Sequence, residues 1–191
     1  MTRLAGLLRP QSRRIGEPNV RLITYRKETV AVPAQERALT TLFGLPAHAL
    51  LNHTIVVLAP LLAFLEILCA VWPAARRRLV WPNLALAAAV VVLTPLTVSA
   101  GEWLYNQQTE HSDILETHEE RAQWAIYFAI GLLVVAVVQA VQHRIESRAA
   151  EPKKALAVIV AVVAVAVGVW ATFGVVMIGD AGAQAVWGTR E

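Results

Sequence analysis

The stretch GLPAHALLNH, residues 44–53, opens the first of four long apolar segments and sets His48 and His53 at its start. Pro46 stands where a helix would begin. Proline suits a first helical turn, because the amide hydrogen that it lacks would have no partner there. Ionisable side chains at the mouth of an apolar segment are costly and usually functional. The stretch therefore predicts both the start of a helix and the place where polar chemistry gathers.

Four segments of the chain carry almost no formal charge. They hold no Asp, Glu, Lys or Arg except Glu66, and they cover residues 49–72, 79–100, 122–142 and 155–179. Each exceeds the roughly 20 residues that a helix needs to cross a bilayer. Hydrophobic residues make up 57% of the 191-residue chain, above the roughly 45–50% of a typical soluble domain. The sequence predicts an all-α membrane protein, a bundle of four transmembrane helices over about residues 47–72, 79–101, 111–143 and 154–179.

The first 41 residues differ from this membrane domain, which we place over residues 42–188. Residues 1–40 hold eight Lys or Arg and three Glu. The basic start is not followed by the apolar run of a secretory signal peptide. We expect a flexible basic tail, in which only residues 20–25 alternate as a strand would. A translation start near the Gly-Leu-Pro turn is the alternative.

The loop charges orient the expected spans. Two loops at the same membrane face carry seven basic residues: Arg76, Arg77, Arg78, Arg144, Arg148, Lys153 and Lys154. The 102–121 loop at the opposite face is acidic. Basic loops remain in the cytoplasm, by a rule that is strongest within about 15–20 residues of a span. We therefore expect a multi-pass protein of the plasma membrane with both termini and the 102–121 loop outside, although the distant basic tail argues for the reverse.

Four of the five histidines come from distant parts of the chain to this external face: His48, His53, His111 and His118. A third helix that starts at residue 111 would put His111 and His118 on its apolar side. His48 and His53 are five residues apart, so on a straight helix they point about 140° away from each other. We expect His53, the deeper of the two, to face His118 across the bundle.

Three interpretations of these histidines stay open. In the first, they hydrogen-bond helix ends and have a structural role. In the second, His53 and His118 ligate the iron of a b-type haem axially, as facing histidines do in four-helix membrane cytochromes, with His48 and His111 as further candidates. In the third, zinc or copper is bound. The ligands of that metal would be His53, His111, His118 and Glu102.

Glu66 is the one carboxylate inside an expected span, where a charge indicates a functional site. An ion pair with the basic residues 76–78 is one interpretation, because long arginine side chains can reach inward. A proton or ion pathway is the other. Gln139 lies at the same membrane level and is a candidate partner.

The stretch GLPAHALLNH resembles the start of a bacterial family of four-helix membrane proteins, domain-of-unknown-function family 2231, and its actinobacterial branch in particular. The similarity extends over about residues 42–188. It includes the exit of the second helix, Ser99-Ala100-Gly101-Glu102, the turn Gly179-Asp180-Ala181-Gly182, and the tail Val186-Trp187-Gly188. Asn52, in place of an apolar residue, and the long basic tail depart from the family pattern. The resemblance implies a four-helix membrane domain and no established activity.

The sequence lacks the motifs of hydrolases and transferases: it has no phosphate loop, nucleophile elbow or zinc-protease helix. Its basic residues are not interleaved with aromatic ones, which argues against nucleic-acid binding. Electron transfer is the one enzymatic role left open. We expect a redox-linked accessory protein that binds haem or a metal at the external histidines. The alternative is a cofactor-free structural subunit whose partners are the bilayer and other membrane subunits or copies of itself.

Overall fold

The computed structural model describes residues 41–42, 45–149 and 154–188. The expected basic tail, including residues 20–25, lies outside these ranges except for Thr41. Strands β1 (Thr41–Leu42) and β2 (Leu45–Pro46) pair antiparallel, with Leu42 opposite Leu45. The second strand leads directly into the first long helix, so Pro46 ends β2 and the helix begins at the next residue, Ala47.

Five helices follow: α2 (Ala47–Val71), α3 (Pro73–Tyr105), α4 (Asp113–Ala122), α5 (Ala125–Glu146) and α6 (Lys154–Trp187). In the part of the chain that the structure describes, four helical stretches are long and apolar enough to cross a membrane. They are α2, α3, α4 together with α5, and α6. The predicted all-α bundle of four membrane-spanning helices is confirmed.

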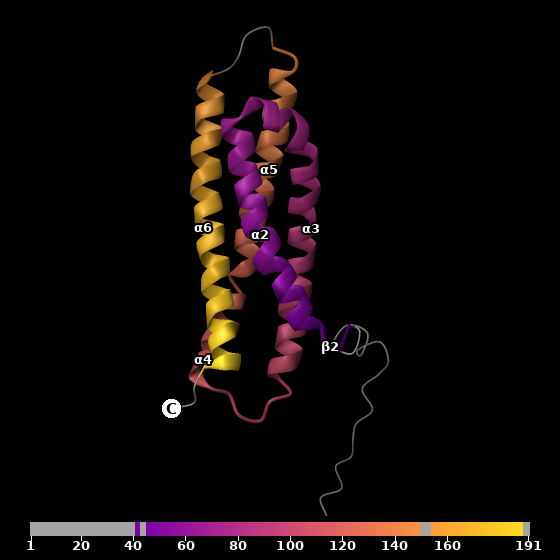
Figure 1. Cartoon of the computed structure of the whole chain (residues 1–191), viewed down its shortest axis with the longest axis vertical. Coiled ribbons are helices and arrows are strands. Elements are labelled where there is room, and N and C mark those ends of the chain that lie inside the picture. Colours follow the sequence, from indigo (N-terminus) through magenta and orange to yellow (C-terminus); the bar gives the residue numbers. More distant parts are fainter. Residues whose placement is uncertain (1–40, 43–44, 150–153, 189–191) are drawn as a thin grey trace, which may run out of the picture. The chain divides into compact units, whose positions relative to one another are not determined.

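The four long helices stand side by side as an up-and-down bundle (Figure 1). Helix α2 packs against α3 and α6, and α5 packs against the same two helices. Short connections favour such antiparallel neighbours, and only Trp72 separates α2 from α3. The short helix α4 packs mainly against α6 at one end of the bundle.

The core of the bundle is built from small and aliphatic side chains. Leu62 and Leu132 are fully buried, and they are surrounded by alanines such as Ala59, Ala87 and Ala171. In lipid, helices gain little hydrophobic energy by associating, so close packing of small residues holds them together.

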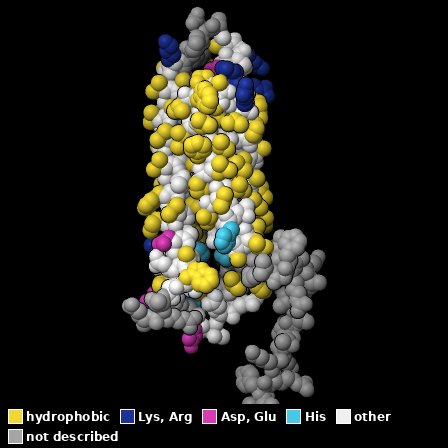
Figure 2. Space-filling model, in the orientation of Figure 1, with side chains coloured by type: hydrophobic (Ala, Val, Ile, Leu, Met, Phe, Trp, Pro, Cys, Tyr) yellow, Lys and Arg dark blue, Asp and Glu magenta, His cyan; other side chains and the backbone are white. Residues whose placement is uncertain are grey.

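The outer surface of the bundle is apolar as well (Figure 2). Side chains on the outward faces of the helices are more than 60% exposed, among them Val57, Phe64, Val92, Val158 and Phe173. Contiguous apolar patches on soluble proteins rarely exceed a few hundred Å². Lipid must therefore cover this surface, and the chain is a multi-pass integral membrane protein.

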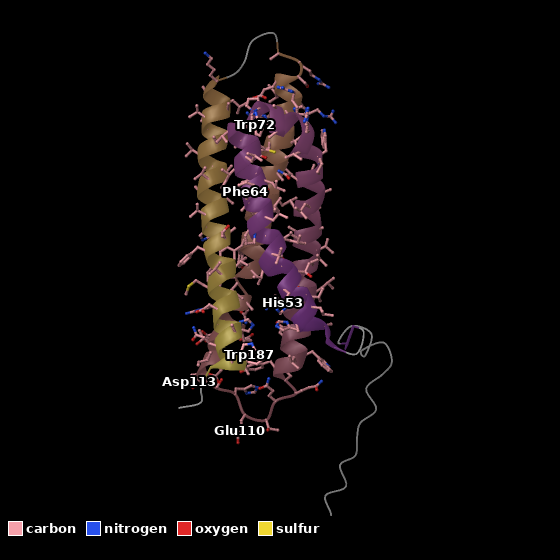
Figure 3. The ribbon with its side chains drawn as sticks, viewed as in Figure 1. His53, Phe64, Trp72, Glu110, Asp113 and Trp187 are labelled. Atoms are coloured by element: carbon pink, nitrogen blue, oxygen red, sulfur yellow. The ribbon has the colours of Figure 1, made fainter. Side chains whose placement is uncertain are left out.

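The two ends of the bundle differ in charge. Basic side chains gather at one end, which we call the arginine end, and histidines lie near the other, which we call the histidine end (Figure 2). Helix α2 runs between them, with His53 near the histidine end and Trp72 at the arginine end (Figure 3). The loop that carries Glu110 lies at the histidine end, as does Trp187 of α6.

Helix α3 is longer than the sequence indicated. It begins at Pro73 rather than near residue 79, because Pro73 occupies the first helical position immediately after Trp72. Similarly, α6 passes through Gly179 and Gly182 and ends only at Trp187. Glycine is tolerated in membrane helices where a neighbouring side chain packs against it.

The third expected helix is divided in two. The amide of Trp124 donates to the carbonyl of Arg121, and the amide of Tyr127 donates to the carbonyl of Trp124. These three-residue spacings form a tight turn between α4 and α5. At its start, α4 is capped by Ser112, whose Oγ accepts from the amide of Leu115. His111 therefore precedes the helix instead of lying on its apolar face.

Candidate functional site

His48 lies in the first turn of α2 and is held by α3. Its Nδ1 is 3.0 Å from the carbonyl oxygen of Thr97. A carbonyl oxygen can only accept, so Nδ1 carries a proton, and in the neutral imidazole Nε2 then keeps a free lone pair. Gly101 follows Thr97 by one helical turn and makes room for the ring, because a Cβ there would lie 2.8 Å from Cε1 of His48.

His118 of α4 is held by α6 in the same way. Its Nδ1 is 3.0 Å from the carbonyl oxygen of Ile178. One turn further along α6, a Cβ at Gly182 would lie 2.9 Å from Cε1 of His118. Each histidine thus rests on a helix that offers a carbonyl and, four residues later, a glycine. In the neutral form of each ring, this repeated arrangement selects the tautomer that leaves Nε2 unprotonated.

The two anchored rings face each other across the bundle. Their centroids are 6.2 Å apart, and their planes are inclined at 76°. When two imidazoles bind one ion through nitrogens at about 2.0–2.1 Å, their centroids are separated by about 5–6 Å. The observed separation is slightly larger than this range, and the two rings meet edge to face.

Two small cavities flank the pair, and both histidines line both of them. The first has a volume of about 30 Å³ and extends toward apolar side chains such as Ile55 and Val175. The second, of about 70 Å³, is also lined by Glu102 and Glu119. A buried water needs at least about 10–15 Å³. The second cavity therefore has room for a few waters beside two carboxylate-bearing residues.

His53 is not the partner of His118 in this structure. It is exposed, and its Nδ1 lies 2.5 Å from the carbonyl oxygen of Ala49 on its own helix. Helical phase explains why His48, and not His53, lies beside His118. His53 shares a face with the exposed residues Val57 and Phe64, whereas His48 shares a face with the buried core of α2, which includes Ile55 and Leu62.

The other residues of the expected metal set are also apart from the pair. His111 is exposed and stacks on Tyr105, with ring centroids 3.9 Å apart and Nε2 3.1 Å from the Tyr105 carbonyl oxygen. Glu102 is exposed at the second cavity. Among the described residues, no three His, Cys, Asp or Glu side chains are placed to hold a metal ion together.

A haem does not fit between these histidines. Ligand pockets for molecules of drug size or larger enclose about 300–1,000 Å³, whereas the cavities beside the pair measure about 30 and 70 Å³. The two rings also lie close to Gly101 and Gly182, because a Cβ at these positions would be only 2.8 and 2.9 Å from them. A porphyrin would require the helices at the histidine end to separate, while a single ion would not.

The sequence did not indicate three roles in the pair: the space that Gly101 and Gly182 leave for the rings, and the place of His48, rather than His53, opposite His118. The glycines lie in helical segments with no turn to explain them, and such glycines often mark close approach of another group. The carbonyl acceptors of α3 and α6 leave no side-chain signal at all.

The arginine end holds a second group of polar side chains, around Glu66. This residue is fully buried. Arg76 does not pair with it, but forms a two-pronged ion pair with Glu146, at 2.7 and 3.0 Å. Gln139 does contact Glu66, because its Nε2 donates to the Glu66 backbone carbonyl at 2.7 Å.

Comparisons of the chain with protein-family models, with curated proteins and with solved structures find no match. The resemblance seen in GLPAHALLNH stays an expectation. The function must accordingly be argued from the residues themselves.

Proposed function

We propose that the protein is a metal-binding accessory protein of the plasma membrane, which holds one zinc or copper ion between His48 and His118. The observation that supports this most strongly is the double anchoring of the two rings. Histidines that ligate metals almost always donate their second ring N–H to a carbonyl, a carboxylate or water, which fixes the tautomer. Neutral imidazole nitrogens suit zinc and copper.

The rest of the coordination sphere would come from water. Closed structural zinc sites have four protein ligands, whereas sites with fewer keep positions open for water or a substrate. The cavity of about 70 Å³ beside the pair can supply such waters. Glu119 and Glu102 line it and would accept hydrogen bonds from them. An ion held in this way is exchangeable, which suits a role in metal handling or, with copper, electron transfer.

We propose further that the histidine end faces outside the cell. The arginine end carries Arg76, Arg77, Arg78, Arg144 and Arg148, while the loop and helix α4 at the histidine end carry mostly acidic residues. Basic residues near the ends of spans are retained in the cytoplasm. The metal site would then be open to the external medium.

The proposal is tested by metal analysis of the purified protein in detergent. After loading with zinc or copper and removal of free metal, we expect one ion per chain. The absorption spectrum of the protein as isolated provides the second arm. A Soret band would show that the protein binds haem instead of a single metal ion, and would overturn the proposal. A protein that retains neither metal nor haem would also contradict it.

In that last case the alternative is a cofactor-free structural subunit. The same two hydrogen bonds would then serve only to tie α2 to α3 and α4 to α6. Replacing either histidine would lower the stability of the bundle without changing its metal content.

A further inference from the structure

Four buried polar side chains gather at the arginine end, and we call them the oxygen cluster: Glu66 of α2, Asn83 of α3, and Gln139 and Gln142 of α5. Each is at most 2% exposed. Buried polar groups inside a membrane protein are costly and mark functional sites by default. The cluster lies at the opposite end of the bundle from the histidine pair and is independent of it.

The amide nitrogens of the cluster all have partners. Gln139 donates to the backbone carbonyl of Glu66 at 2.7 Å, and Gln142 donates to the carboxylate of Glu146 at 2.7 Å. Asn83 donates to the Sγ of Cys69 at 3.4 Å. Carbonyl and carboxylate oxygens only accept, so the orientation of both glutamine amides is fixed with their oxygens turned away from these partners.

The oxygens of the same side chains are without partners. Within the described residues, five buried oxygens accept no hydrogen bond: Oε1 and Oε2 of Glu66, Oδ1 of Asn83, and Oε1 of Gln139 and of Gln142. Every unsatisfied atom is an acceptor. Native proteins rarely leave buried polar atoms unpaired, and each exception requires an explanation. A single bound cation would satisfy these acceptor oxygens together.

A chain of contacts holds these side chains together. Arg76 of α3 donates to the carbonyls of Cys69 and Ala70 at 2.9 and 3.3 Å. It also binds Glu146, which accepts from Gln142. Gln139 lies one turn before Gln142 on α5, and its amide donates to the backbone carbonyl of Glu66. These contacts link α2, α3 and α5, the three helices that carry the unsatisfied oxygens.

The charge balance sets the valence of the cation that these oxygens would bind. Arg76 and Glu146 neutralise each other, at 2.7 Å. Of the charged side chains in this contact network, Glu66 alone has no counter-charge among the described residues. One positive charge is therefore needed to compensate an ionised Glu66, and a divalent ion would leave an excess in a region of low dielectric.

We propose that the oxygen cluster binds one sodium ion, with the Glu66 carboxylate as its charged ligand and the amide oxygens of Asn83, Gln139 and Gln142 as neutral ligands. Hard cations take oxygen ligands of these kinds, from carboxylates and from Asn and Gln side chains. Such a site couples the packing of α2, α3 and α5 to the sodium concentration.

Thermal unfolding of the purified protein tests this site. We expect the midpoint to rise with NaCl, in a saturable way, relative to choline chloride at equal ionic strength. Glu66→Gln removes the charged ligand and should abolish the sodium-dependent rise. Glu116→Gln, which changes an exposed carboxylate at the other end, should retain it.

If Glu66→Gln does not fold, Asn83→Leu provides the second test, since it removes one oxygen ligand and should raise the sodium concentration needed for half of the effect. Equal unfolding midpoints of the wild type in NaCl and choline chloride would overturn the proposal. So would an infrared band of a protonated carboxylic acid that persists in NaCl and disappears in Glu66→Gln, because a proton would then occupy the site.

Discussion

Each histidine of the pair is pressed against a glycine, and the space available at that glycine decides whether the ring keeps its place. At Gly182, a Cβ would meet the ring of His118 at 2.9 Å. At Gly179, one turn earlier on the same helix, a Cβ would have only an ordinary contact, 3.6 Å from Val56. The two positions therefore form a matched pair for mutation.

We predict that Gly182→Ala lowers metal retention, because the His118 ring must move away from the carbonyl of Ile178. Gly179→Ala should leave metal retention unchanged and stabilise the helix by up to about 1 kcal/mol, since alanine is the better helix former. Metal content and thermal unfolding of the two variants measure both effects. Equal metal content in both variants would show that the glycine contact does not position His118.

The division of the third span into α4 and α5 decides where His118 lies. The turn at Gln123–Trp124 allows the axis of α4 to differ from that of α5, and α4 packs against α6. His118 reaches the carbonyl of Ile178 from this position. The short helix thus positions half of the site, and its stability should control the site.

We predict that Ser112→Ala loosens α4, because it removes the Oγ that accepts from the amide of Leu115. Loss of such a cap costs about 1 kcal/mol. Hydrogen exchange in residues 113–122 should accelerate, while exchange in α5 should stay unchanged. Ser112→Asp retains a capping oxygen and should exchange as the wild type does; equally fast exchange in both variants would contradict the role of the cap.

The ion pair between Arg76 and Glu146 joins α3 to α5 at the arginine end. Arg76 is 3% exposed, so Glu146→Gln leaves a buried charge without its partner. We expect a loss of about 3 kcal/mol in the free energy of unfolding, measured by denaturant titration in detergent. Glu110→Gln, in an exposed loop, should change it by less than about 0.5 kcal/mol. A similar small change in both variants would mean that the ion pair is dispensable.

The four spans could be predicted because the bilayer demands long segments without charge, and only Glu66 breaks that pattern. The pairing at the site could not be predicted with equal certainty. It depends on which of His48 and His53 shares a face with Ile55 and Leu62, a question that the exact start of α2 decides. The acceptors of both rings are backbone carbonyls, which the sequence does not mark. The turn inside the third span contains no Pro or Gly from which it could have been predicted.

The whole molecule carries different chemistry at its two ends: a proposed transition-metal site at the histidine end and a proposed sodium site at the arginine end. Residues of the apolar core, among them Leu62 and Leu132, lie between them. The orientation of the protein decides which solution each site meets. From the charge distribution we propose that the histidine end lies outside.

Labelling of an introduced cysteine measures that orientation. The native Cys69 is buried, so Glu110→Cys in the exposed loop supplies the reactive thiol. We predict that a membrane-impermeant maleimide labels it in intact cells. Arg148→Cys, at the arginine end, should react only after permeabilisation. The opposite result at both positions would reverse the orientation of the protein.

We propose that His48, and not His53, binds the metal ion together with His118. The most direct measurement is the metal content of three variants after equal loading: His48→Ala, His118→Ala and His53→Ala. We predict that the first two lose the ion and that His53→Ala retains one ion per chain, with all three folded by circular dichroism. Retention by His48→Ala together with loss from His53→Ala would contradict the claim.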